Sequence, residues 1–299
     1  MSKLVTRSDE LYPVSPRDVL RAAALSFLRR ASPSGRNANE YLSRNRVQIA
    51  NLHNVFPDEE VSFKNLLSRL ALKHSFVTYS EAVSRIWSGE IDRPYLTFSF
   101  DDGQKSCVRA AEILSGMGAS ACFFINPWIV GERDERKVEE YCRSQLLAPP
   151  MEFMDWHDVE RVLSLGHEVG SHGMHHLKLS ELTTMQAESE IGESFAAIKS
   201  KTGNAKHYAW TYGHFEQFTA FAARFVFEVG HLSCASGVRG CHSARGTGRD
   251  LCLRRDHVIA KWPLTHVEYF LARASASSSQ ATNCWPTEWE LSKETVQAR

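Results

Sequence analysis

The sequence predicts an α/β protein built around a parallel β-sheet, and two observations carry this prediction. From residue 95 onward, short apolar segments that favour strands alternate with amphipathic segments that favour helices. The segments "YLTFSF" (95–100) and "SACFFI" (120–125) are separated by one helix-length segment, which is the spacing of a βαβ unit. This alternation indicates either a parallel (β/α) barrel or a doubly wound sheet.

The other elements follow from local signals. The longest helix is expected to begin at Thr183, where Gln186 stands in the position of a capping box, and to end near Gly203. Apolar periodicity predicts further helices over residues 15–30, 61–74, 78–90, 105–118 and 155–166. Strands are expected over residues 167–172, 207–210, 224–230 and 256–260.

The helix expected over residues 15–30 is both amphipathic and basic. Its apolar side is formed by Leu20, Ala23, Ala24 and Phe27. We expect this side to pack against the body of the protein, and contact with a membrane surface is the alternative.

Composition narrows the functional classes. The chain has 35 basic and 35 acidic residues among 299, so its charge does not point to nucleic acid as a partner. No segment approaches about 18 uninterrupted apolar residues, and we therefore expect no transmembrane helix. The seven cysteines are scattered and no signal-peptide pattern opens the sequence, which predicts reduced thiols and a cytoplasmic location.

Polar clusters follow two of the expected strands. Asp101 and Asp102 come directly after the strand at 95–100, and His172 and His176 follow the strand at 167–172. Because the carboxyl ends of parallel strands meet at one edge of a sheet, these side chains are expected to share that edge. Two imidazoles and one carboxylate can bind a metal ion and leave positions for water and substrate. The second carboxylate could then accept a proton from the water.

These motifs resemble those of the NodB-type polysaccharide deacetylases, carbohydrate esterase family 4. "SFDDG" (99–103) is similar to the family motif T-F-D-D-G, and "EVGSHGMHHLKLSELT" (168–183) contains a stretch similar to H-[ST]-x-x-H. The resemblance extends over about residues 95–213 and is faint from there to about 258. It implies an irregular parallel (β/α) barrel with an N-terminal helical extension. Family members hydrolyse N-acetyl, or sometimes O-acetyl, groups on sugars with a divalent metal, often zinc.

The resemblance also implies roles for the residues. By motif position, Asp101 would be the general base, and Asp102, His172 and His176 would hold the metal. Zinc is expected, with Co²⁺, Ni²⁺ or Mn²⁺ as alternatives. The chain is thereby divided into an N-terminal extension (1–90) with helices packing on the barrel, a deacetylase catalytic domain (91–275) and a C-terminal tail (276–299).

A third family motif, R-x-P-[YW]-G, falls on "AWTYG" (209–213), and "YAWTYG" is closer to a branch that reads F-A-Y-P-Y-G. Tyr212 is expected to offer its backbone N–H to the oxyanion of the tetrahedral intermediate, a role that requires no particular side chain. Ala209 stands at the arginine position of this motif, so the arginine that orients the base must come from elsewhere. Arg255 is the candidate.

The general acid that protonates the leaving amine is a late histidine in the family. His231, His257 and His266 compete for this role, and His257 is preferred because it is expected on a strand next to Arg255.

The predicted function is therefore removal of an N-acetyl group from a saccharide. The expected substrate is an intracellular precursor of a surface glycan: nucleotide-linked, lipid-linked or an oligosaccharide. A basic N-terminal helix suits a lipid-linked substrate and peripheral contact with the inner face of a membrane. The alternatives are a deformylase or cyclic-amide hydrolase on the same fold, and a sugar-binding relative without catalytic activity. The sequence does not predict the oligomeric state.

Overall fold

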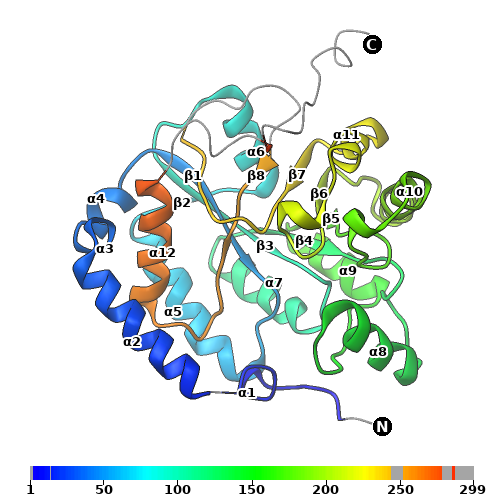
Figure 1. Cartoon of the computed structure of the whole chain (residues 1–299), viewed down its shortest axis with the longest axis horizontal. Coiled ribbons are helices and arrows are strands. Elements are labelled where there is room, and N and C mark those ends of the chain that lie inside the picture. Colours follow the sequence, from blue (N-terminus) through cyan, green and yellow to red (C-terminus); the bar gives the residue numbers. More distant parts are fainter. Residues whose placement is uncertain (1–2, 14, 244–251, 278–284, 287–299) are drawn as a thin grey trace.

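The computed structural model describes residues 3–13, 15–243, 252–277 and 285–286. Its centre is a parallel sheet that curls into a partial barrel, with helices around the outside (Figure 1). The described strands follow the order β8-β7-β6-β5-β4-β3-β1-β9, and β2 pairs with β3 beside this path. Each pairing between strands is parallel. The structure thus confirms the predicted α/β class and parallel barrel.

The strands are short, as the sequence predicts. Their bounds are β1 Arg46–Leu52, β2 Ser75–Phe76, β3 Pro94–Phe100, β4 Ala121–Ile125, β5 Glu168–Ser171, β6 His207–Ala209, β7 Ser233–Ala235, β8 Cys252–Leu253 and β9 Asp256–His257.

The helices lie mainly between consecutive strands and cover the sheet (Figure 1). Their bounds are α1 Ser8–Leu11, α2 Pro16–Ala31, α3 Pro33–Arg36, α4 Ala38–Leu42, α5 Glu60–Ala71, α6 Tyr79–Ser88, α7 Ser106–Gly116, α8 Glu135–Tyr141, α9 Trp156–Ser164, α10 Thr184–Thr202, α11 Ala220–Val229 and α12 Leu264–Ala276. Helix α10 has the predicted capping box of Thr183 and Gln186, and it ends at Gly203 in the left-handed conformation (φ 82°).

Strand β3 shows how the core positions the site. Its side chains alternate, and Leu96, Phe98 and Phe100 pack into the main core with residues of α5, α7 and α12. Phe100 stacks on Phe123 of β4 at 5.0 Å between ring centroids. The same alternation leaves Ser99 on the opposite face, at the end of the strand from which the chain turns.

Strand β1 was not expected from the sequence. It pairs with β3 over seven residues, from Arg46 beside Pro94 to Leu52 beside Phe100, and with β9 on its other side. The sheet therefore begins well before residue 91, within the stretch assigned to a helical extension. The division of the chain at residue 91 remains a prediction.

The prediction of a strand over residues 224–230 was wrong, because this stretch belongs to helix α11. Thr219 caps the helix by accepting a hydrogen bond from the Ala222 N–H, and the helix ends at Gly230. Its β-favouring residues are accommodated because Ala222 and Val226 share a buried helix face. The strand comes directly afterwards as β7.

The structure describes only part of the predicted C-terminal tail. Most of the predicted tail lies outside the described residues, but Trp285 is buried and stacks on Trp210 at 5.6 Å between ring centroids. No helix in the described part of the chain has the length and apolar character needed to cross a membrane.

Candidate active site

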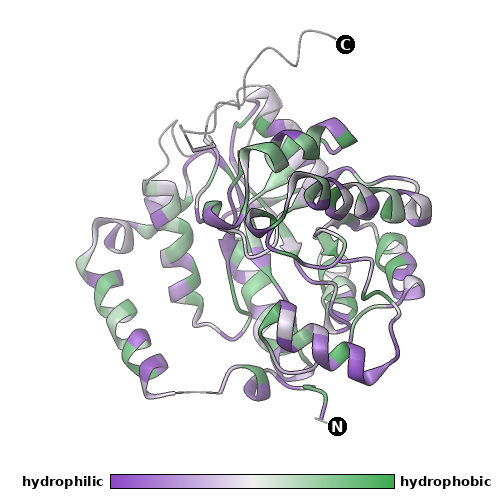
Figure 2. Ribbon diagram, turned by 45° about the vertical axis from the view of Figure 1, so that its right-hand side comes forward, coloured by the Kyte–Doolittle hydropathy of each residue, from purple (hydrophilic) through white to green (hydrophobic). Residues whose placement is uncertain are grey.

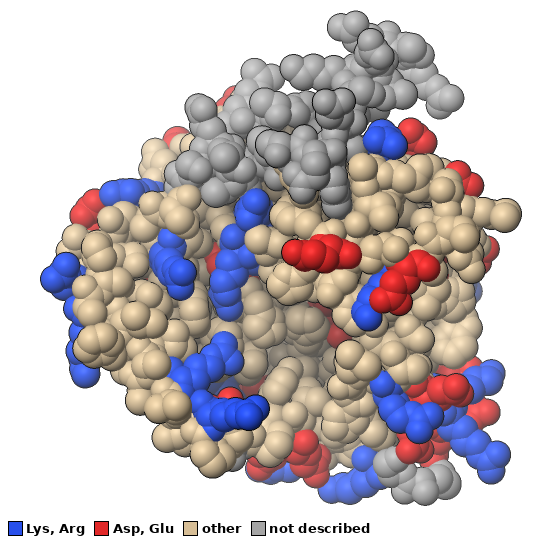
Figure 3. Space-filling view, in the orientation of Figure 1, with Lys and Arg blue, Asp and Glu red and all other residues tan. Residues whose placement is uncertain are grey.

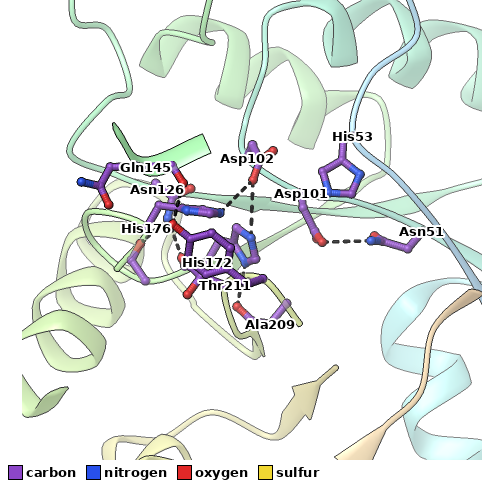
Figure 4. A network of polar contacts seen from close by, with 12 residues as sticks. Asn51, His53, Asp101, Asp102, Asn126, Gln145, His172, His176, Ala209 and Thr211 are labelled. Carbon is purple, nitrogen blue, oxygen red and sulfur yellow. Dashed lines mark hydrogen bonds and ion pairs between the residues drawn. The ribbon is translucent and has the colours of Figure 1, made fainter. Parts of the chain in front are cut away.

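Strand register brings the polar residues together at the carboxyl edge of the sheet. Leu52 of β1 lies beside Phe100 of β3. The residues that follow these two strands, His53 and Asp101, therefore emerge next to each other. In the same way Ile125 of β4 lies beside Ser171 of β5, and His172 emerges on the same edge. Figure 4 shows the resulting cluster.

Asp102, His172 and His176 form a buried three-residue cluster. The Asp102 Oδ1 atom lies 3.5 Å from His172 Nε2 and 3.4 Å from His176 Nε2. One candidate ligand atom from each residue lies within 4.8 Å of the other two. Both imidazoles face the Asp102 carboxylate (Figure 4). The structure therefore brings together the three residues that the sequence analysis expected to bind a metal.

The backbone at these positions adopts an unusual conformation. Asp102, His176 and Tyr212 have φ values of 72°, 61° and 61°, in the left-handed region that L-residues rarely occupy. Each such residue costs on the order of 1 kcal/mol or more, and such residues cluster at functional sites. The turn after β3 is what directs Asp102 towards the histidines.

Contacts outside the cluster orient the His172 imidazole and fix the loop that carries His176. The Nδ1 atom of His172 lies 2.7 Å from the carbonyl oxygen of Ala209, so an Nδ1–H donor leaves the Nε2 lone pair facing Asp102. The loop that carries His176 is fixed by buried Glu190 of α10, which accepts hydrogen bonds from the His175 backbone N–H at 2.7 Å and from His175 Nδ1 at 2.9 Å. The bond to Glu190 raises the pKa of His175.

The three residues fit a divalent cation. Among the described residues, Asp102 Oδ1 is a buried oxygen without a hydrogen-bond partner, and the imidazole nitrogens lie too far from it for good hydrogen bonds. Burial by itself would raise the pKa of Asp102, but contacts with His172 and His176 hold it well below its ordinary value. An ionised carboxylate with two imidazoles is a donor set suited to zinc.

Asp101 is held differently from its neighbour. Arg255 donates to both of its carboxylate oxygens, from Nη1 at 2.7 Å and from Nη2 at 2.9 Å, and Asn51 Nδ2 donates to Oδ2 at 2.9 Å. Burial would raise the pKa of Asp101, but the interactions with Arg255, His172 and His53 together lower it to about 2. Arg255, the candidate for the missing third-motif arginine, is therefore in bidentate contact with Asp101.

Tyr212 lies beside the histidine cluster. Its ring is 4.9 Å from the His176 ring between centroids, and its hydroxyl donates to the Gln145 carbonyl oxygen at 2.6 Å. Among the described residues, none accepts a hydrogen bond from the Tyr212 backbone N–H. This N–H is therefore available for the oxyanion role that the resemblance implies.

The late histidines lie in different environments. His231 is buried between Phe195 and Tyr208, and the His266 ring faces Ser26 of α2 at 3.1 Å. His257, the preferred acid, packs edge-on against His53 at 5.3 Å between ring centroids. Burial lowers the pKa of His257 to about 3, so its ring carries no charge at neutral pH.

His53, which the sequence analysis did not consider, lies next to the carboxylates. Figure 4 shows its ring beside Asp101, across from the metal-ligand cluster. Its electrostatic interaction with the two carboxylates contributes to the lowered pKa of both Asp101 and Asp102. Its Nδ1 atom is buried without a hydrogen-bond partner in the described part of the structure. His53 is therefore a further candidate for proton transfer at this site.

The sequence also matches a known family model. Residues 88–226 match the model described as polysaccharide deacetylase, and this stretch contains both the Asp pair and the His pair. This stretch of the chain is therefore similar to the polysaccharide deacetylases. No curated protein sequence matches the chain.

Solved structures of deacetylases share the fold over about three quarters of this chain. IcaB from Ammonifex degensii is 18% identical, with a TM-score of 0.61 over 76% of this chain and 97% of that one. The Streptococcus pyogenes deacetylase PplD, solved in complex with acetate, is 11% identical, with a TM-score of 0.56 over 77% and 98%. The BpsB deacetylase domain from Bordetella bronchiseptica is 17% identical, with a TM-score of 0.51 over 73% and 96%.

Two residues of the candidate site lie outside the matched stretch. His53 precedes it and Arg255 follows it. The structure brings both to the Asp101 carboxylate through the neighbouring strands β1 and β9. The signal that could have revealed His53 is "RVQIANLH" (46–53), where apolar and polar residues mostly alternate.

Proposed function

We propose that the chain is a metal-dependent hydrolase that removes an N-acetyl group from a saccharide. The observation that carries the proposal is that two adjacent carboxylates have different partners. Asp101 is held by Arg255 and Asn51, while Asp102 faces two imidazoles. Similarity of the matched stretch to the polysaccharide deacetylases supports deacetylation of a sugar.

The metal-binding residues in this proposal are Asp102, His172 and His176. When bound there, a zinc ion would lower the pKa of a water molecule and polarise the carbonyl of the acyl group. Asp101 accepts the proton of the attacking water, and its pKa of about 2 keeps it ionised at neutral pH. Arg255 and Asn51 fix the carboxylate in the orientation that this transfer requires.

Two further groups complete the proposed reaction. The Tyr212 backbone N–H stabilises the negative charge on the oxygen of the tetrahedral intermediate. His53 protonates the departing amine, in place of His257. Its position beside Asp101 supports this assignment, as does the low pKa of His257, which would leave that ring unprotonated.

We propose an intracellular precursor of a surface glycan as the substrate, in nucleotide-linked, lipid-linked or oligosaccharide form. Four described cysteines, Cys107, Cys122, Cys142 and Cys234, support a reducing compartment, because they are buried free thiols. No observation favours the reading of an inactive sugar-binding relative, because a carboxylate, an arginine and a histidine converge at the site.

The proposal is tested by measuring acid released from N-acetylated and N-formylated saccharides and from a cyclic amide. We expect zinc-loaded protein to release acetate from the N-acetylated substrate fastest, and Asp101→Asn to lose at least 100-fold in kcat, on the order expected for loss of a general base. Faster formate release or ring opening would assign one of the alternatives. Full activity in Asp101→Asn would contradict the assigned base.

A further inference from the structure

Helix α2 presents its apolar side to solvent instead of to the protein. The sequence analysis expected Leu20, Ala23, Ala24 and Phe27 to pack against the body, and all four are exposed. Their neighbours Val19 and Leu28 are exposed as well, and none of the 16 residues of the helix is buried. The exposed fractions of Val19, Leu20 and Phe27 are 62%, 72% and 69%.

The opposite side of α2 holds the helix on the protein. Leu25, Ser26 and Arg29 are half-buried, and at 100° per residue they lie across the helix from Leu20 and Phe27. The helix packs on α12, where the Ser26 hydroxyl lies 3.1 Å from His266 Nε2. The orientation of α2 is therefore fixed by contacts on its body side, and the outward apolar stripe is a feature of the fold.

A core-packing helix of the same chain shows the contrast. In α5, Phe63, Leu66, Leu67 and Leu70 are buried with at most 2% exposure. In α2 the equivalent stripe points outward. Single exposed apolar residues are ordinary, but a continuous stripe marks an interaction surface.

The charge around the stripe identifies its partner. Helix α2 carries four arginines and one carboxylate, Asp18. Arg17, Arg21 and Arg30 are exposed, whereas Arg29 lies on the body side. None of these arginines forms an ion pair with a carboxylate in the described part of the chain. On the face of the molecule drawn in Figure 3, Lys and Arg side chains lie on the side where α2 is found, with little Asp or Glu among them. The chain as a whole has no net charge, so this excess is local.

We propose that α2 docks the protein on a bilayer surface that contains anionic lipid. An apolar stripe flanked by arginines is the pattern of a helix that lies in the plane of a membrane interface. A second copy of the chain fits less well, because it would bring the same arginines against each other. Figure 2 shows α2 at the edge of the molecule, with bands of apolar residues along its length.

Helix α2 is connected by side-chain contacts to the carboxyl edge of the sheet, where the candidate active site lies. Arg21 lies over the Trp262 ring at 5.5 Å, Trp262 meets His257 at 5.7 Å, and His257 meets His53 at 5.3 Å between ring centroids. A bilayer against α2 therefore lies beside the edge that carries His53. This inference rests on the proposed function. If the chain is a deacetylase, the placement of α2 favours a saccharide joined to a membrane lipid as the substrate over a nucleotide-linked one.

Vesicle flotation of the full-length protein tests the docking. We expect wild type to float with vesicles of phosphatidylcholine and phosphatidylglycerol at low salt, and to float at least tenfold less with phosphatidylcholine alone or at high salt. The double variant Leu20→Ser/Phe27→Ser should bind anionic vesicles at least tenfold more weakly. The matched control, Val61→Ser on α5, changes a side chain that is 72% exposed and should bind as wild type does.

Four outcomes would overturn the docking proposal: no binding of wild type to anionic vesicles, undiminished binding of the double variant, an equal loss in Val61→Ser, or a dimer in light scattering that the double variant abolishes. Its failure is distinguishable from failure of the proposed function. The double variant should release acetate from a soluble acetylated saccharide as fast as wild type does, and Asp101→Asn should still bind vesicles.

Discussion

At the scale of single residues, two adjacent aspartates have different surroundings and therefore different predicted tasks. Arg255 and Asn51 donate to Asp101, whereas Asp102 Oδ1 faces two imidazoles and has no hydrogen-bond partner among the described residues. The "DDG" stretch predicts both carboxylates at the strand end. It does not predict the partner of either one, because the partners come from strands and loops distant in the chain.

The histidine assignment can be tested at this scale. We expect His53→Gln to lower kcat 100-fold or more, because the departing amine loses its proton donor, and to leave zinc binding unchanged. His257→Gln is the matched control, since its ring contacts His53 but is uncharged at neutral pH. Steady-state rates and metal content of both variants show whether His53 or His257 is the general acid. A large loss of kcat in His257→Gln with little in His53→Gln would restore the late histidine as the acid.

The Arg255 contact makes a prediction about pH. Burial raises the pKa of Asp101, whereas Arg255 together with His172 and His53 lowers it to about 2, so removing the guanidinium should let the pKa rise. In Arg255→Gln the acid limb of kcat/KM should therefore move to higher pH, by about 1 pH unit or more. Arg109→Gln, on the exposed surface of α7, is the control and should leave the limb in place. An unmoved acid limb in folded Arg255→Gln would show that Arg255 does not set the ionisation of Asp101.

At the scale of elements, the structure shows why β1 escaped sequence analysis. Its polar residues Arg46, Gln48 and Asn51 are all buried, although such residues usually indicate an exposed face. They are satisfied by contacts that span the chain: Arg46 Nε donates to Gln48, and Asn51 Nδ2 donates to Asp101. The predictions of β3, β4, β5 and β6 were confirmed, because these strands are bordered by helices and turns that the sequence marks clearly.

At helix α11 the sequence predicted a strand where the structure has a helix. The stretch "RFVFEVG" (224–230) is rich in residues that favour strands, yet it continues a helix that begins at Ala220. Tertiary packing of Ala222 and Val226 overrides the local preference. The start of the helix was signalled by Thr219, its N-cap.

The seam between β1 and β9 makes stability depend on pH. Asp256 is fully buried beside Gln48 and Arg239, and burial raises its pKa from 3.8 to about 7. The folded protein therefore keeps a proton on Asp256 that the unfolded chain loses above about pH 4. The stabilising contribution is complete below pH 4 and is lost as the pH rises to about 7.

The corresponding variant is Asp256→Asn, which does not ionise. Relative to it, the free energy of unfolding of wild type should fall between about pH 4 and pH 7, by a few kcal/mol. Urea unfolding across this range measures the difference. A difference that does not change with pH would mean that Asp256 ionises alike in the folded and unfolded chain.

At the scale of the whole molecule, the sheet joins residues that lie far apart in the sequence. His53 emerges from β1 and Asp101 from β3, while Arg255 comes from the segment before β9. The two motifs that the sequence displays therefore make only part of the candidate site. The rest depends on how the first strand of the sheet is inserted between β3 and β9.

The most direct test of the central claim is acetate release by metal-stripped protein during titration with zinc. The account predicts no release without metal, a rise that saturates near one equivalent in wild type, and no restoration in Asp102→Ala because a ligand is missing. Asp101→Asn should bind the zinc and release no acetate. Undiminished acetate release by the stripped wild-type protein, or full restoration of Asp102→Ala by zinc, would contradict the account.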